Sequence, residues 1–130
     1  MNKPEFFITP GYGDFMLKEL HYSQAVKIGN RVETAGQGGW DDAFNFPEAL
    51  EDEIARAFDN IARTLATAGA SWEHVIHVNS YHVGGFPPEV NATMVKLFRY
   101  SAVTCRGKRQ SGPSLVWPHS ACHRCGLKYV

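Results

Sequence analysis

A long amphipathic segment at the centre of the chain limits the possible folds more than any other feature. The segment FPEALEDEIARAFDNIARTLATAGAS predicts a helix that begins at Pro47, a favoured first helical residue, and ends at Gly69. Its first turn is acidic, which complements the positive end of the helix dipole (Glu48, Glu51, Asp52 and Glu53). Apolar residues recur every three or four positions along it: Leu50, Ile54, Phe58, Ile61 and Leu65. A stripe of this kind has to be buried against another layer, so the sequence requires a sheet.

Segments on both sides of this helix supply strands and a second helix. In AVKIGNRVETAG, two β-prone runs flank Gly29-Asn30, which predicts a hairpin with a type II′ turn. HVIHVNSYHV, residues 74–83, is rich in β-branched residues and predicts a strand. EVNATMVKLFRY, residues 89–100, predicts a second helix with one apolar face (Val90, Met94, Leu97 and Phe98). The order of hairpin, helix, strand and helix predicts an α+β sandwich with two helices on one face of the sheet.

The last thirty residues differ in composition from the rest. Residues 1–99 hold all thirteen acidic residues and no cysteine, whereas residues 101–130 hold five basic residues, no acidic residue and all three cysteines. An even spread of acids would leave such a run on the order of 1–2% of the time, so we expect a boundary near Arg99. A fold of this order should return with one or two more strands, but the tail offers only SLVW, residues 114–117, between prolines.

Cysteines and histidines near the end of the chain raise the question of a metal or redox site. Cys122 and Cys125 form a C-x-x-C pair, with His119 and His123 nearby and Cys105 upstream. The spacing does not match the paired ligand couples of structural zinc sites, and no helix can follow the pair as in thioredoxin-like sites. His74, His77 and His82 do not share one face of the predicted strand, so they form no metal triad. We therefore predict no metal and no cofactor.

Bulk properties exclude several classes of function. The formal net charge is zero, so no overall field favours nucleic acid or a membrane surface. No apolar run approaches 18 residues, and the N-terminus has no signal-peptide pattern. Three cysteines are an odd number, which argues against a secreted disulfide framework. The sequence thus predicts a cytoplasmic protein.

Three segments within residues 15–99 carry motifs in a fixed order: HYSQAVKIGNRVETAGQGGWD, AFDNIARTLATAGASWEHVIHVNSYHV and EVNATMVKLF. The first is similar to the Y-S-Q-A-V…G-N…S-G-Q motif of the Rid proteins, the YjgF-like reactive-intermediate imine deaminases that also carry the label endoribonuclease L-PSP. The second and third look like the two blocks that follow this motif in the same family. The resemblance implies a chorismate-mutase-like α+β subunit with a mixed sheet. It also implies a homotrimer with ligand clefts between subunits.

The same resemblance implies five ligand-binding residues. Tyr22 would line the cleft, Gly36 would place its backbone N–H against the ligand, and Gln37 follows it in the motif. Ala35 stands where the family has serine, so one hydroxyl of the cleft is missing. Asn91 matches the asparagine of the second helix. Three of these residues could instead have a purely structural role. Tyr22 could be a half-buried strand tyrosine, Gly36 a β-bulge glycine, and Asn91 a residue at a helix start that bonds its own backbone.

The family's catalytic arginine and glutamate are absent from the positions where they belong. An arginine fork would hold a substrate carboxylate, and a glutamate on the last strand would position the hydrolytic water. Read one base out of phase through synonymous codons, residues 104–130 can give a segment containing IWTIVGVAALG and MRIEIR, with tryptophan at the arginine position and the glutamate kept. We therefore interpret residues 1–99 as a Rid-like domain and residues 100–130 as an aberrant, frameshifted tail in place of the last two strands.

The sequence leaves three functions open. The first is binding or hydrolysis of a small imine or enamine, with weak or no activity on 2-imino acids because the arginine is missing. The second is ligand binding without turnover on the same fold. The third is an endoribonuclease or translation inhibitor, which the neutral charge of the chain does not favour.

Overall fold

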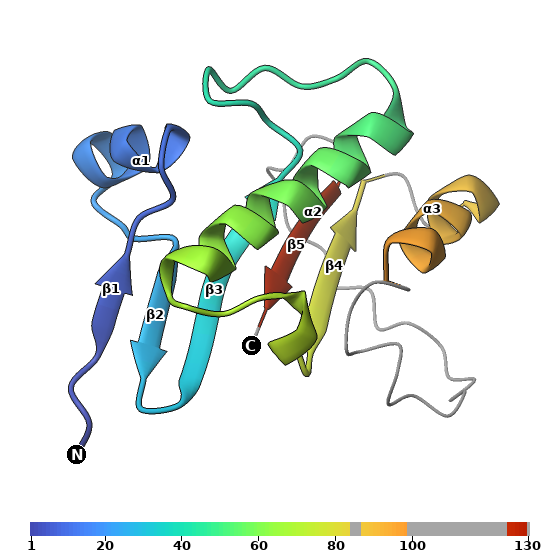
Figure 1. The fold of residues 1–130 in the computed structure, drawn as a ribbon. Helices are drawn as coiled ribbons and strands as arrows, with labels where there is room; N and C mark the ends of the chain where they lie inside the picture. Colours follow the sequence, from blue (N-terminus) through green and yellow to red (C-terminus); the bar gives the residue numbers. More distant parts are fainter. Residues whose placement is uncertain (84–86, 99–124, 130) are drawn as a thin grey trace.

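The computed structural model describes residues 1–83, 87–98 and 125–129 (Figure 1). The elements follow in the order β1 (Glu5–Phe7), α1 (Tyr12–Leu20), β2 (Ala25–Ile28), β3 (Arg31–Gly38), α2 (Leu50–Thr67), a short 3-10 helix (Trp72–His74), β4 (Val78–His82), α3 (Pro88–Phe98) and β5 (Cys125–Tyr129). The predicted α+β class is confirmed. Three helices rather than two are present among the described residues.

The five strands form one sheet in the order β1-β2-β3-β5-β4, and all four pairings are antiparallel. The expected mixed sheet is therefore wrong for the described residues. The reason is the position of β5. Strands β3 and β4, joined through α2, run in the same direction, but β5 lies between them and runs against both (Figure 1).

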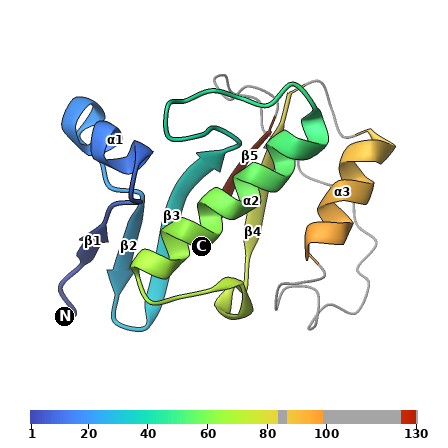
Figure 2. The ribbon, with the colours of Figure 1, turned by 45° about the horizontal axis from the view of Figure 1, so that its top comes forward.

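Helix α2 lies across the sheet, and α3 lies beside it (Figure 2). The predicted stripe forms the core: Ile54, Phe58, Ile61 and Leu65 are buried, and Val75, Val90 and Met94 join them. The helix begins at Leu50 rather than Pro47 because Ala49 keeps an extended backbone with ψ of 130°. Gly69, with φ of +74°, ends the helix as predicted.

The hairpin and the second predicted helix are confirmed. Gly29 has φ of +62° and Asn30 has no positive φ, as a type II′ turn requires. The predicted strand at residues 74–83 is shorter, because Ser71–His74 forms a capped turn instead. The backbone N–H of Ser71 donates to Nδ1 of His74 at 3.0 Å, and β4 begins only at Val78.

The tail contributes a strand that the sequence did not predict. Backbone groups of Cys125–Tyr129 pair with β3 and with β4, so this segment fills a central place in the sheet. Pairing between strands uses backbone groups, and this segment contains no proline, so its unusual composition does not prevent pairing. The expected loss of both final strands is thus wrong for these five residues. SLVW and the remaining tail lie outside the described residues.

Candidate functional site

A groove of about 530 Å³ lies where the chain passes from α1 into β2. It is lined by residues from the end of β1, the α1–β2 connection and the paired strands β2 and β3 (Phe6, His21, Tyr22, Ser23, Gln24, Ala25, Val26, Glu33, Thr34 and Ala35). Two of the five predicted ligand-binding residues, Tyr22 and Ala35, therefore share one groove.

The end of α1 sets the position of Tyr22. His21 takes the left-handed conformation with φ of +57°, and its backbone N–H donates to the carbonyl of Leu17 at 3.1 Å. This reversal sends the chain away from the helix and toward β2. The Tyr22 hydroxyl donates to Sδ of Met16 at 3.0 Å, and 36% of the residue remains exposed. Thioether sulfur is a weak acceptor, so the phenol can exchange this contact for a ligand at small cost.

Gln24 holds the groove together, and sequence reasoning missed its role. Its side chain is fully buried, and its Oε1 accepts a hydrogen bond from the backbone N–H of Thr9 at 2.9 Å. Its own backbone bonds to Phe7 and to Ala35, at 3.0 and 2.8 Å. Gln24 thereby ties the end of β1, β2 and β3 to one another beside Tyr22. The only signal was its place in the HYSQ motif.

Ala35 and Gly36 form a β-bulge on β3. Thr34 pairs with Tyr129 and Gln37 with Leu127, so β3 carries one residue more than β5 over this stretch. Gly36 lies exposed in the bulge beside the groove, and Ala35 is half-buried in its wall. The bulge agrees with the structural reading of Gly36. It is also compatible with a ligand contact, because bulges are frequent next to active sites.

Gln37 points away from the groove. Its side chain is fully buried, its Oε1 accepts from the Tyr12 hydroxyl at 2.8 Å, and its Nε2 donates to the Ala35 carbonyl at 3.2 Å. Burial raises the pKa of the Tyr12 phenol, against opposing contributions from Thr64, Thr9 and Arg63. Within one subunit Gln37 therefore anchors α1 to β3 and does not reach a ligand in the groove.

Asn91 lies on α3, at the opposite end of the sheet from Tyr22. Helix α3 lies beside β4, whereas Tyr22 precedes β2 near the other edge (Figure 1). The Asn91 side chain is exposed, and its backbone N–H donates to the Pro87 carbonyl at 3.1 Å. One subunit therefore does not bring Tyr22 and Asn91 together.

The groove is poor in positive charge. Its ionisable lining residues are His21, Glu33 and the phenol of Tyr22, and none of its lining residues is a lysine or an arginine. Glu33 forms an ion pair with Nε of Arg31 at 2.8 Å, and Arg31 lies outside the groove. Thr34 is buried in the wall, with 3% of the residue exposed, and its hydroxyl has no hydrogen-bond partner among the described residues. The groove thus offers hydroxyl groups and a carboxylate but no fixed cation.

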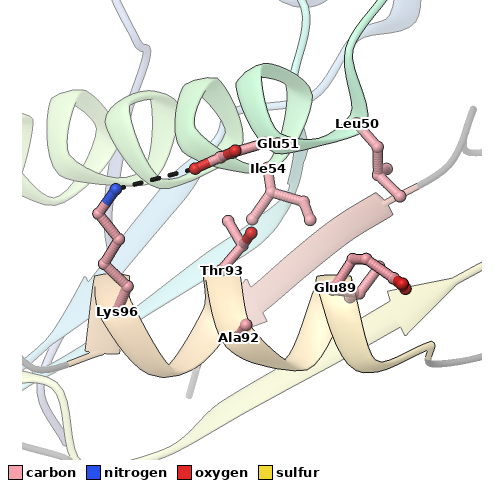
Figure 3. A pocket seen from close by; sticks show the side chains of 8 residues that line it. Leu50, Glu51, Ile54, Glu89, Ala92, Thr93 and Lys96 are labelled. Atoms are coloured by element: carbon pink, nitrogen blue, oxygen red, sulfur yellow. Dashed lines mark ion pairs between the residues drawn. The ribbon is translucent and has the colours of Figure 1, made fainter.

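A smaller hollow of about 330 Å³ separates α2 from α3 (Figure 3). Lys96 and Glu51 reach toward each other across it, with Nζ and Oε1 3.8 Å apart, while Leu50, Ile54 and Val90 supply apolar walls. Both charged side chains are well exposed. This arrangement is typical of a helix–helix contact bridged by a surface ion pair, so we do not assign a ligand to it.

The histidines in the described part of the chain do not come together in a metal site. No group of three or more potential ligand side chains comes together in the part of the chain that the structure describes. His74 caps a turn, and Nε2 of His77 lies 3.2 Å from Oδ1 of Asn79. Burial lowers the pKa of His82, which keeps its ring neutral near pH 7.

The C-x-x-C pair and the upstream Cys105 lie almost wholly outside the described residues. Within the part of the chain that the structure describes, no helix has the length and apolarity needed to cross a membrane.

The structure is that of a small α+β domain, with α2 lying across an antiparallel sheet and a groove beside β2 and β3. A model of the family described as Endoribonuclease L-PSP matches residues 16–109. The chain therefore belongs to this family, which is the Rid or YjgF family that the sequence motifs indicated.

Individual relatives agree with this assignment. The chain is 35% identical over 76 residues to the RutC family protein YjgH of Escherichia coli, covering 58% of this chain and 57% of that protein. It is 33% identical over 82 residues to a 2-iminobutanoate/2-iminopropanoate deaminase of Dermatophagoides farinae, covering 60% and 63%. These matches thus span less than two thirds of either relative. A solved structure of protein YjgH superposes with a TM-score of 0.69 at 20% identity, covering 98% of this chain and 93% of that one.

Proposed function

We propose that this protein binds a small imine or enamine that lacks a carboxylate, in the groove beside Tyr22, and hydrolyses it to a carbonyl compound and ammonia. The observation that carries the proposal is the lining of the groove. Tyr22 and Ala35 line the same groove. Its lining residues supply a phenol, a threonine hydroxyl and a carboxylate, and none of them is a lysine or an arginine. A substrate carboxylate would find no guanidinium fork there, whereas a neutral or protonated imine nitrogen would be accepted.

The deaminase chemistry of this proposal is supported by the family and by the relative from Dermatophagoides farinae, whose printed name gives that activity. The substrate class differs from the one in that name because of the groove. The family's glutamate that would position water is absent, because residues 101–130 contain no acidic residue, so we expect slow turnover. The sequence predicts no cofactor for this reaction, since hydrolysis of a C=N bond needs only water and proton transfer.

We also propose that the groove is completed by a second copy of the chain in a homotrimer. The face of the sheet opposite α2 carries Phe6, Ile28 and Tyr81, which are 67%, 47% and 44% exposed. Val32 packs against the core, and strand register places Phe6 and Ile28 on the other face of the sheet. On β4, Val78 also packs against the core, and Tyr81 points to the other face. A second copy covering this face would bury these side chains. It would also allow Asn91 of one subunit to approach Tyr22 of another. A cytoplasmic location stays a prediction.

The test compares two imines that differ in the carboxylate. 2-Iminobutanoate is generated by an amino-acid oxidase, and the imine of 2-phenylethylamine by a flavin amine oxidase, each with a buffer control for spontaneous hydrolysis. We expect faster release of ammonia only from the carboxylate-free imine, and a loss on Tyr22→Phe. Lys18→Gln, an exposed lysine on α1 outside the groove and outside the proposed contact face, is the control. A preference for 2-iminobutanoate would refute the substrate class.

Two other results would select the alternatives. Saturable binding of the imine's stable amine analogue with no ammonia release would indicate ligand binding without turnover. Salt-sensitive RNA cleavage that Tyr22→Phe does not alter would indicate the nuclease named in the family description.

A further inference from the structure

A second pocket, of about 760 Å³, lies at the tip of the β2–β3 hairpin. We call it the hairpin-tip pocket. It is enclosed by the hairpin turn, the end of α2 and the segment that leads into β4 (Lys27, Gly29, Asn30, Arg31, Val32, Leu65, Ala68, Gly69, Ala70, Ser71, His74, Val75, Ile76 and His77). It shares no lining residue with the groove beside Tyr22.

One part of this pocket is apolar. Leu65 and Val75 belong to the buried core, and Val32 packs against it. Ile76 also lines the pocket, yet 77% of this residue is exposed. An exposed isoleucine beside a wall of buried aliphatic side chains leaves apolar surface that the body of a ligand would cover, with a gain in hydrophobic free energy.

The other part is basic. Lys27, Arg31, His74 and His77 line the pocket, and its described lining contains no aspartate or glutamate. Strand register places Lys27 on the same face of the hairpin as Val32, whereas Arg31 pairs with Ile28 on the other face and gives its Nε to Glu33 at 2.8 Å. Lys27 is therefore the cation on the side of the apolar wall. Because Nδ1 of His74 accepts from the backbone N–H of Ser71, a neutral His74 ring carries its proton on Nε2 and can donate it.

The end of α2 does not cancel this positive charge. A helix C-terminus usually presents free carbonyls and a partial negative charge. Here the Leu65 carbonyl accepts from the N–H groups of Ala68 and Ala70, and the Ala66 carbonyl accepts from Gly69. These carbonyls are therefore occupied within the turn.

From the two halves together we infer that the hairpin-tip pocket binds a small organic anion, namely a carboxylate attached to an aromatic or branched aliphatic body. The body would lie against Val75 and Ile76, and the carboxylate would meet Lys27, with the ring N–H of His74 as a second donor. The volume is within the range of pockets that take small organic molecules. The inference is independent of the reaction proposed for the groove.

The experiment is isothermal titration calorimetry of the full chain with three probes: 4-phenylbutyrate, its uncharged amide, and inorganic phosphate. We expect the carboxylate to bind roughly 10-fold more tightly than the amide, since a charge-assisted contact is about that much stronger. Phosphate alone should bind more weakly than the carboxylate, because it lacks the apolar body. Equal affinity of carboxylate and amide, or of carboxylate and phosphate, would overturn the assignment.

Variants locate the binding. Lys27→Gln should weaken binding of the carboxylate roughly 10-fold, whereas Lys27→Arg keeps the charge and should retain binding. Lys18→Gln changes an exposed lysine on α1, paired with Glu19 at 3.4 Å, and serves as the matched control. Tyr22→Phe should leave the affinity unchanged, which separates this pocket from the groove. Unchanged affinity in Lys27→Gln would refute the site.

Discussion

The buried pair of Tyr12 and Gln37 gives the sharpest test of how this site is built. Tyr12 is 1% exposed and Gln37 is fully buried, and the phenol donates to Oε1 of Gln37 at 2.8 Å. The family motif would make Gln37 a ligand-binding residue, whereas the contacts make it a support for β3. The change that separates the two roles is Tyr12→Phe, alone and combined with Gln37→Met.

The expected cost follows from the contacts that each variant loses. Tyr12→Phe keeps the ring, with Trp40 at a centroid distance of 5.8 Å and the Arg63 guanidinium 5.3 Å from the ring centroid. It leaves Oε1 of Gln37 buried without its donor, which should lower the free energy of unfolding by about 2 kcal/mol. Gln37→Met should cost less, about 1 kcal/mol, because the phenol retains interactions with Thr64 and Thr9. The double variant should fall short of additivity by about 1 kcal/mol.

The measurement is urea unfolding of all four proteins at one protein concentration, together with ligand titration of the groove. Fixed concentration is needed because assembly would add to the apparent stability. We expect Gln37→Met to retain the affinity for the groove ligand under conditions where it is folded, and Tyr22→Phe to lose it. A Gln37→Met variant with unchanged stability and lost affinity would refute the supporting role. So would fully additive effects in the two single variants.

Three further outcomes are expected elsewhere in the fold. Gly39→Ala should destabilise the protein strongly, because the added Cβ would clash with the Glu53 carbonyl oxygen on α2. Gly69→Ala places its Cβ within 4 Å of no atom, so it should cost only the strain of a φ of +74°. Equal losses of melting temperature in the two variants would contradict this. Burial holds the pKa of His82 in the folded protein below its usual 6.5, so the unfolded chain binds more protons and the free energy of unfolding should fall as the pH drops below 6.5. Urea unfolding at several pH values measures this dependence, and His82→Gln should weaken it. An unchanged pH dependence in the variant would exclude His82 as its cause. Deleting residues 125–130 removes the strand between β3 and β4 and should abolish cooperative unfolding by circular dichroism; an unchanged midpoint would mean that β5 adds no stability.

The central part of the fold was predictable from periodicity. The stripe of α2 and the Gly29-Asn30 turn each depend on local rules, and the structure confirms both. Helix α1 was missed because its burial rests on Tyr12 and Met16 alone, while Phe15, Leu17 and Leu20 are exposed. So few buried positions give no readable stripe. The antiparallel sheet was missed for a different reason, since the place of β5 depends on pairing between distant segments.

The site was predictable only in part, because motif spacing identifies positions but not directions. The motif grouped Ala35, Gly36 and Gln37, but the bulge on β3 separates them: Ala35 lines the groove, whereas Gln37 turns toward Tyr12. Gln24 lies in the same motif, yet its role depends on Thr9 and the backbone of β1, far away in sequence. The turn cap made by His74 was not predicted, because the sequence placed His74 at the start of a strand.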